Sequence, residues 1–138
     1  MLRVVFDTNI LVSSLIRRGK PRDLWIKAVS GEIELVLSPQ ILREFDEVIG
    51  RPKLRRYITA AKLHRIKKLL YSKATLVRPR TKFTQLMINP NDNILVETAF
   101  DGKASYLVSG DRHLLALKEF KKTRIVTVNK MLEVLRRT

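Results

Sequence analysis

The 138-residue chain carries 28 Lys and Arg against 13 Asp and Glu, a net charge of +15, and 45% of its residues are hydrophobic. These values exclude a disordered protein and predict one globular domain over residues 1–138, with a polyanionic partner such as nucleic acid or an acidic protein segment. The chain has no cysteine and no charge-free stretch longer than nine residues, which excludes disulfides, thiolate metal sites and a membrane span and favours the cytoplasm.

Short apolar runs alternate with longer helical patterns along the chain. The predicted strands are Leu2–Phe6, Ile33–Leu37, Tyr106–Val108 and Ile125–Val128, with Thr75–Val77 as a weaker fifth. Their nearly continuous hydrophobicity is typical of strands buried on both faces. Strands that alternate with helices indicate βαβ units. We therefore expect an α/β protein, a three-layer α/β/α sandwich around a central parallel sheet.

Capping residues mark the ends of the main predicted helices. The marked helices run from Ser38-Pro39 to Gly50, from Asn89-Pro90 to Asp101-Gly102, and from Asn129 toward the end of the chain. A further helix follows Asp7, and a short amphipathic helix follows Asp111.

Two aspartates follow predicted strands directly. Asp7 ends the run Val4-Val5-Phe6, and Asp111 follows Tyr106–Val108 in the sequence Ser109-Gly110-Asp111. In parallel α/β sheets the functional site lies beyond the carboxyl ends of the strands. Glu44, in the second turn of the helix after Ile33–Leu37, and Asp92, in the first turn after Asn89-Pro90, are placed to join them. The pattern therefore predicts four carboxylates at one edge of the sheet.

Each acid taken alone has an ordinary structural interpretation. An Asp after a strand, such as Asp7 or Asp111, is often a turn or helix-capping residue. Asp92 is favoured near a helix start by the helix dipole, and Glu44 fits an exposed helix face. The four together at one edge favour a functional site.

Converging carboxylates repel one another and raise each other's pKa unless a cation neutralises them. Oxygen ligands suit Mg²⁺ or Mn²⁺. Such an ion lowers the pKa of a bound water and stabilises the transition state of phosphodiester hydrolysis. The sequence therefore predicts Asp7, Glu44, Asp92 and Asp111 as both metal ligands and catalytic residues.

A long basic stretch supplies a surface for the substrate. No acid occurs from Val48 to Asn91, and residues 51–82 hold twelve Lys and Arg. One-sign charge over this length favours phosphate contacts, and a solvated face or an acidic partner protein is the alternative. The predicted nucleic-acid contacts are Arg51, Lys53, Arg55, Arg56, Lys62, Arg65, Lys67 and Lys68.

A smaller basic cluster, Arg17-Arg18-Gly19-Lys20, follows the first helix and could extend the same groove. Tyr57 and Tyr71 interleave with the long basic stretch. They are interpreted first as packing residues and otherwise as stacking partners for bases.

Four segments in this order resemble the PIN-domain ribonucleases, and within them the branch described as VapC-like toxins of toxin–antitoxin pairs. The segments are VVFDTNILVSSL, IELVLSPQILREF, INPNDNILVETA and ASYLVSGDRHLLAL. The resemblance implies a parallel-sheet α/β/α fold and Mg²⁺- or Mn²⁺-dependent cleavage of RNA by Asp7, Glu44, Asp92 and Asp111. It also implies supporting polar roles for Asn9 and Ser109, a small antitoxin partner and a homodimer.

One departure from the family pattern opens an alternative. Where this branch commonly has Asp-Pro-Asp-Asp, the chain has Asn89-Pro90-Asn91-Asp92, so only Asp92 keeps its carboxylate. The lost charge implies weaker metal binding and motivates a runner-up, an RNA-binding or antitoxin-partnered protein that no longer cuts. A third hypothesis, a phosphohydrolase with Asp7 as nucleophile, typically needs a general acid two residues on, where this chain has Asn9.

Overall fold

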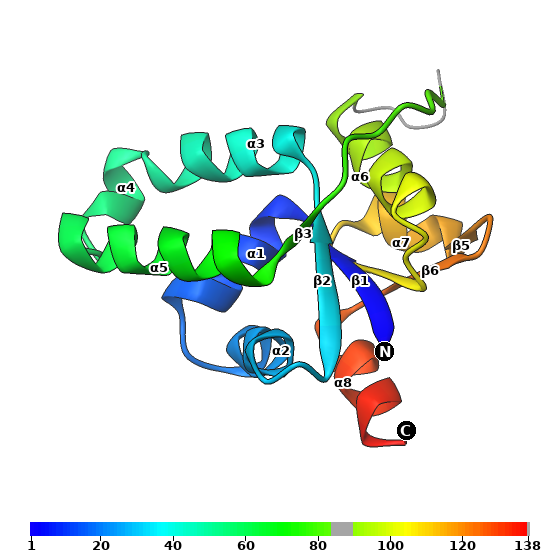
Figure 1. Ribbon diagram of the computed structural model, residues 1–138, viewed down its shortest axis with the longest axis horizontal. Helices are drawn as coiled ribbons and strands as arrows, with labels where there is room; N and C mark the ends of the chain where they lie inside the picture. Colours follow the sequence, from blue (N-terminus) through cyan, green and yellow to red (C-terminus); the bar gives the residue numbers. More distant parts are fainter. Residues whose placement is uncertain (84–89, 138) are drawn as a thin grey trace.

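The computed structural model describes residues 1–83 and 90–137. In chain order the elements are β1 (Leu2–Phe6), α1 (Thr8–Ile16), α2 (Lys20–Val29), β2 (Ile33–Leu37), α3 (Pro39–Ile49), α4 (Pro52–Arg55), α5 (Ala60–Lys73), β3 (Thr75–Leu76), α6 (Pro90–Asp101), β4 (Tyr106–Val108), α7 (Arg112–Leu117), β5 (Glu119–Phe120), β6 (Thr123–Val126) and α8 (Val128–Arg136). Figure 1 shows the strands in the middle of the molecule with helices on both sides.

The described strands form one six-stranded sheet in the order β3-β2-β1-β4-β6-β5. Every pairing is parallel except the β5–β6 pair. The predicted α/β fold with a central, mostly parallel sheet is confirmed, and the antiparallel edge strand β5 was not predicted. β5 was missed because two residues, Glu119 and Phe120, carry no readable strand pattern, and their pairing depends on the turn at Lys121-Lys122.

The predicted strands β1, β2 and β4 have the expected bounds. The prediction Ile125–Val128 is shifted, because β6 ends at Val126 and Thr127 caps α8 by accepting a hydrogen bond from the Lys130 N–H at 3.1 Å. The last helix therefore begins at Val128 and not at Asn129. The weak strand is shorter than predicted, although the Val77 N–H still donates to the Leu37 carbonyl at 2.8 Å.

The helix predicted from Asn89-Pro90 is present from Pro90 to Asp101, while Asn89 lies outside the described residues. This helix, α6, packs against β1, β2 and β4, and α8 packs against α2 and β4. Fully buried side chains such as Phe6, Phe45 and Leu107 fill the core between sheet and helices. The helices within the described ranges are too short or too polar to cross a membrane.

Gly102, just after α6, sits where a side chain has no room. A Cβ built there would lie 2.8 Å from the Thr98 carbonyl oxygen and 2.8 Å from Val36 Cγ1. The glycine thus lets the end of α6 approach β2 closely.

We expect Gly102→Ala to lower the free energy of unfolding by about 1–3 kcal/mol, because the added methyl group overpacks this contact. Urea denaturation measures the change. Gly110→Ala is the matched control, because a Cβ at Gly110 meets nothing within 4 Å. Equal losses in both variants would show that the close approach at Gly102 is unimportant.

Candidate functional site

Two neighbouring strands, β1 and β4, place the first two polar groups of the site. Their parallel register pairs Phe6 with Val108, so Asp7 and Ser109 follow at the same level beyond the carboxyl ends. The Asp7 N–H donates to the Val108 carbonyl at 3.0 Å, which ties the two ends together. Sheet pairing therefore fixes the position of Asp7.

The Asp7 side chain is held by two hydrogen bonds and is only 6% exposed. Its Oδ1 accepts from the Ile10 N–H at 2.8 Å, and its Oδ2 accepts from the Ser109 hydroxyl. The Ser109 Oγ in turn accepts from the Asp111 N–H at 3.0 Å. Because the Ser109 Oγ accepts from the Asp111 N–H, its single hydroxyl proton is free to be donated to the Asp7 carboxylate. Asp7 is thus the N-cap of α1, and it also faces the carboxyl edge of the sheet.

Asp111 is the N-cap of α7. Its Oδ1 accepts from the His113 N–H at 2.7 Å and from the Leu114 N–H at 3.4 Å. The capping interpretation of Asp7 and Asp111 is therefore correct as far as it goes. It does not explain why both caps face the same cleft.

The other two acids come from helices α3 and α6. Ser38 begins α3 by accepting from the Ile41 N–H at 3.4 Å, and the Thr98 hydroxyl of α6 donates to the Ser38 Oγ at 2.9 Å. This buried contact holds the two helices together. It places the partly exposed Glu44 of α3 opposite Asp92, which is 9% exposed in the first turn of α6.

The four elements enclose a small polar cavity of about 120 Å³. All four predicted acids line it, and the described residues of its lining are Asp7, Thr8, Asn9, Glu44, Asn91, Asp92, Leu95 and Asp111. Ser109 contributes from behind through its bond to Asp7. The structure therefore brings the predicted residues into one place, from positions 7 to 111 of the chain.

Burial and mutual repulsion make this cleft electrostatically unfavourable for ionised acids. Burial raises the pKa of Asp7, and the nearby charges of Asp111 and Glu44 raise it further, against the opposing hydrogen bonds from Ser109 and Ile10. Burial likewise raises the pKa of Asp92, with added repulsion from Asp111, Asp7 and Glu44. The folded protein thus holds carboxylates that would be stabilised by a positive charge.

The donor set fits a hard divalent cation, because every charged group lining the cavity is a carboxylate. The Thr8 Oγ1 is also buried in this lining, with no hydrogen-bond partner among the described residues. In the described part of the chain, however, no three Asp, Glu, His or Cys side chains are arranged to hold one metal ion.

Sequence reasoning did not name Thr8 and gave Asn91 no role in the site, yet both line the cavity. Thr8 adjoins Asp7 at the start of α1, so the position of Asp7 was itself the available signal. Asn91 precedes Asp92 on α6 and reaches the same cavity from the first turn of that helix.

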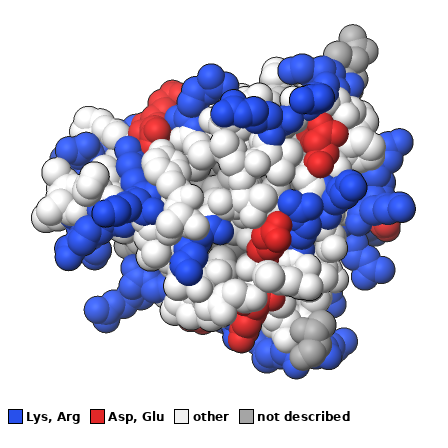
Figure 2. Space-filling model, in the orientation of Figure 1, with Lys and Arg blue, Asp and Glu red and all other residues white. Residues whose placement is uncertain are grey.

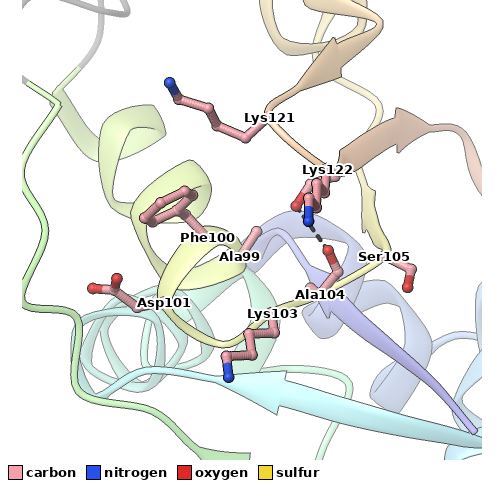
Figure 3. A pocket seen from close by; sticks show the side chains of 9 residues that line it. Ala99, Phe100, Asp101, Lys103, Ala104, Ser105, Lys121 and Lys122 are labelled. Carbon is pink, nitrogen blue, oxygen red and sulfur yellow. Dashed lines mark hydrogen bonds between the residues drawn. The ribbon is translucent and has the colours of Figure 1, made fainter.

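A larger cavity of about 870 Å³ lies at the opposite edge of the sheet, where β4 and β6 begin (Figure 3). Lys103, Lys121 and Lys122 line it, but Figure 3 shows Lys103 and Lys121 pointing in different directions. Its acid, Asp101, already accepts hydrogen bonds from the Arg80 and Thr81 N–H groups. The lining shows no convergent set of chemical groups comparable with the acidic cavity.

The basic stretch lies on α4, α5 and the segment that follows them. Figure 2 shows Lys and Arg side chains gathered over the end of the molecule that α4 and α5 form, at the left. One predicted contact, Lys67, is paired with Asp46 of α3 at 3.0 Å. The packing interpretation of the two tyrosines is wrong, because Tyr57 is 76% exposed and Tyr71 is 51% exposed.

A mostly parallel sheet with an acidic cavity at its carboxyl edge defines an α/β protein whose candidate site is a cluster of carboxylates. The family model described as PIN domain matches residues 3–113, so the chain belongs to the PIN domain family. PIN domains are generally nucleases, and they typically depend on divalent metal ions. No curated protein matches the chain in sequence.

Two solved structures have similar folds. One is a chain from VapBC2 of Rickettsia felis bound to a DNA fragment from their promoter, with 16% identity, a TM-score of 0.63, and coverage of 91% of this chain and 98% of that chain. The other is PAE2754 from Pyrobaculum aerophilum, with 16% identity, a TM-score of 0.65, and coverage of 100% and 91%. At this identity the likeness shows the fold alone.

We expect Asp7→Asn to leave the metal-free melting temperature unchanged or higher at pH 7. Asparagine keeps the capping oxygen and removes a repelling charge. Because the pKa of Asp7 is raised, its ionised form costs stability at neutral pH. Proton uptake removes this cost as the pH falls, so any gain should shrink toward pH 4.

Differential scanning calorimetry in EDTA measures this effect, with Asp23→Asn in the first turn of α2 as a control outside the cavity. Unfolding of metal-free Asp7→Asn would make Asp7 a structural turn residue first.

Proposed function

We propose that the protein is a metal-dependent endoribonuclease that hydrolyses RNA phosphodiester bonds with Asp7, Glu44, Asp92 and Asp111. The observation that carries this proposal is the convergence of four acids, from four different elements, on one cavity of a PIN-domain chain. Their raised pKa values at Asp7 and Asp92 fit a site built for a cation.

The four carboxylates would hold Mg²⁺ or Mn²⁺. When bound, such an ion would supply a water of lowered pKa and positive charge against the developing negative charge on phosphate. Its positive charge would neutralise the repulsion among the four carboxylates.

The chain's own residues would orient this site. Ser109 holds the Asp7 carboxylate through Oδ2, and Ile10 holds it through Oδ1, so the carboxylate cannot rotate freely. Asn9, exposed at the start of α1, and Thr8 supply uncharged polar groups beside the acids. Preorganised groups of this kind need little reorganisation during the reaction.

RNA is the proposed substrate because one long segment of the chain carries only charge of the opposite sign. The arm from Arg51 to Lys82 carries cations and no acid. Such a surface binds a phosphate backbone without sequence preference. The acids would thus act on the phosphodiester while the arm holds the strand.

The biological role we propose is that of a toxin held by a small antitoxin, in the cytoplasm and as a homodimer. The fold it shares with a chain of VapBC2 supports this role. Co-expression with the neighbouring reading frame, followed by light scattering of the purified complex, tests both the partner and the dimer.

A second candidate is a PIN-like protein that binds RNA or an antitoxin without cutting. Asn91 favours it, because an amide lines the acidic cavity beside Asp92, where a fourth aspartate side chain would add charge. Although four acids line the cavity, no three of the described Asp, Glu, His and Cys side chains are arranged to hold one metal ion, which points the same way. RNA that is bound but uncut in every metal would select this candidate.

Asp7→Asn and Glu44→Gln should each lower the cleavage rate at least about 100-fold, because each removes a ligand charge from the cavity. The measurement is cleavage of a mixed pool of structured RNAs in Mg²⁺, Mn²⁺ or EDTA, with products separated by electrophoresis. Only the metal-containing wild-type reactions should give fragments.

Glu47→Gln is the matched control for Glu44→Gln, since both acids lie on α3 and only Glu44 lines the cavity. Glu47→Gln should cut normally. Equal loss in Glu44→Gln and Glu47→Gln, or full activity of Asp7→Asn, would contradict the proposed site.

Binding of RNA should weaken steeply as salt rises, because each phosphate contact releases a counterion. Lys53→Ala and Arg56→Ala should each reduce the slope of log affinity against log salt by about 1. The slope is measured by fluorescence anisotropy of labelled RNA with the Asp7→Asn variant. Salt is varied between about 50 and 300 mM, the range in which such contacts are lost. A flat response would exclude the arm as the binding surface.

A further inference from the structure

A third cavity, of about 510 Å³, lies beyond the carboxyl end of α1. Its lining is Ile16, Arg17, Lys53, Leu54 and Tyr57. Ile16 ends α1 and Arg17 caps it, while Lys53 and Leu54 belong to α4, and Tyr57 follows that helix. The cavity thus joins an apolar floor, two cations and an aromatic ring.

Tyr57 has no packing role that would account for it. The ring is 76% exposed, whereas its neighbour Ile58 is 6% exposed and fills the core. Leu54 and Ile16 also pack against the core from beneath the cavity. The fold therefore depends on the residues around Tyr57, while the tyrosine ring itself faces solvent.

The cavity lies in line with the acidic site along α1. Asn9 lines the acidic cavity and Ile16 lines this one. Residues seven apart on an α-helix share nearly the same face, about 10.5 Å apart along the axis. At about 3.4 Å per stacked nucleotide, this separation corresponds to roughly three nucleotides.

This combination of groups suits one nucleotide of a single strand. An exposed aromatic ring stacks on a base of any sequence, and adjacent Arg and Lys bind the flanking phosphates. No carboxylate lines the cavity to repel them. An acidic peptide would pair with Arg17 and Lys53 but would leave the face of Tyr57 unused, so the lining favours RNA.

We propose that this cavity is a base-stacking subsite that holds single-stranded RNA about three nucleotides from the bond to be cut, with Tyr57 as the stacking residue and Arg17 and Lys53 on the phosphates. The inference rests on the proposed ribonuclease function and deepens it. It makes Tyr57 a positioning residue for cleavage by the acids.

The test is binding of a fluorescein-labelled single-stranded octanucleotide to the full chain carrying Asp7→Asn, in EDTA. In this background Tyr57→Ala should weaken binding about tenfold, and Tyr57→Phe should keep it, because the ring and not the hydroxyl stacks. Ile26→Ala is the control, because Ile26 is a 52% exposed apolar side chain of α2 outside both cavities and outside the basic arm, and it should leave binding unchanged. Equal weakening by Ile26→Ala, or none by Tyr57→Ala, would overturn the subsite.

A second measurement uses the same octanucleotide with a single abasic site moved along it. Affinity should fall at one position when Tyr57 is present, and Tyr57→Ala should erase that position dependence. With an otherwise wild-type chain, the cleaved bond should lie about three nucleotides from that position. If the wild-type chain cuts RNA and the Tyr57→Ala variant binds RNA normally, only the subsite proposal is wrong. If no variant binds RNA, the ribonuclease proposal is wrong as well.

Discussion

The mutual repulsion of four carboxylates at one edge of the sheet is the constraint on which the candidate site depends. β1 and β4 place Asp7 through sheet hydrogen bonds, and α3 and α6 bring Glu44 and Asp92 to the same cavity. The resulting burial and repulsion raise the pKa of Asp7 and of Asp92. This repulsion opposes folding, and packing in the core offsets it.

The same residues stabilise the fold and form the site, and this limits the loss of stability caused by the repelling carboxylates. Asp7 and Asp111 cap α1 and α7, and the Ser109 hydroxyl links them by donating to one and accepting from the other's backbone. Each of these hydrogen bonds offsets part of the repulsion. From the sequence, helix capping and a functional site are alternative explanations for Asp7 and Asp111. In this fold both hold, because a capping residue at the carboxyl end of a strand also lines the acidic cavity.

Much of the fold and the acid set could be predicted because the relevant patterns are local. Apolar runs such as Val4-Val5-Phe6 show buried strands, and parallel topology then sends their ends to one edge. Features set by distant partners could not be read this way. The two-residue strand at Glu119-Phe120 is defined by its pairing with β6. β6 ends before Thr127, because Thr127 caps α8. The Thr8 hydroxyl lacks a hydrogen-bond partner among the described residues because of the packing around it. The exposure of Tyr57 could not be predicted either, because it depends on how the segment after α4 packs against the core.

Acidic and basic side chains gather in different places on the molecule. Four of the 13 acidic residues line a cavity of about 120 Å³, whereas the arm from Arg51 to Lys82 carries twelve cations and no acid, and Arg17 and Lys53 line the cavity beyond the end of α1. A polyanion is therefore attracted by the surface at long range and repelled at the cavity unless a cation lies there. Under the proposed function, a bound metal would be a condition for substrate entry as well as for chemistry, because without it the phosphate of a strand held on the arm would stay out of the cavity. Binding and cutting would then be separable, and loss of one acid would leave the basic surface intact.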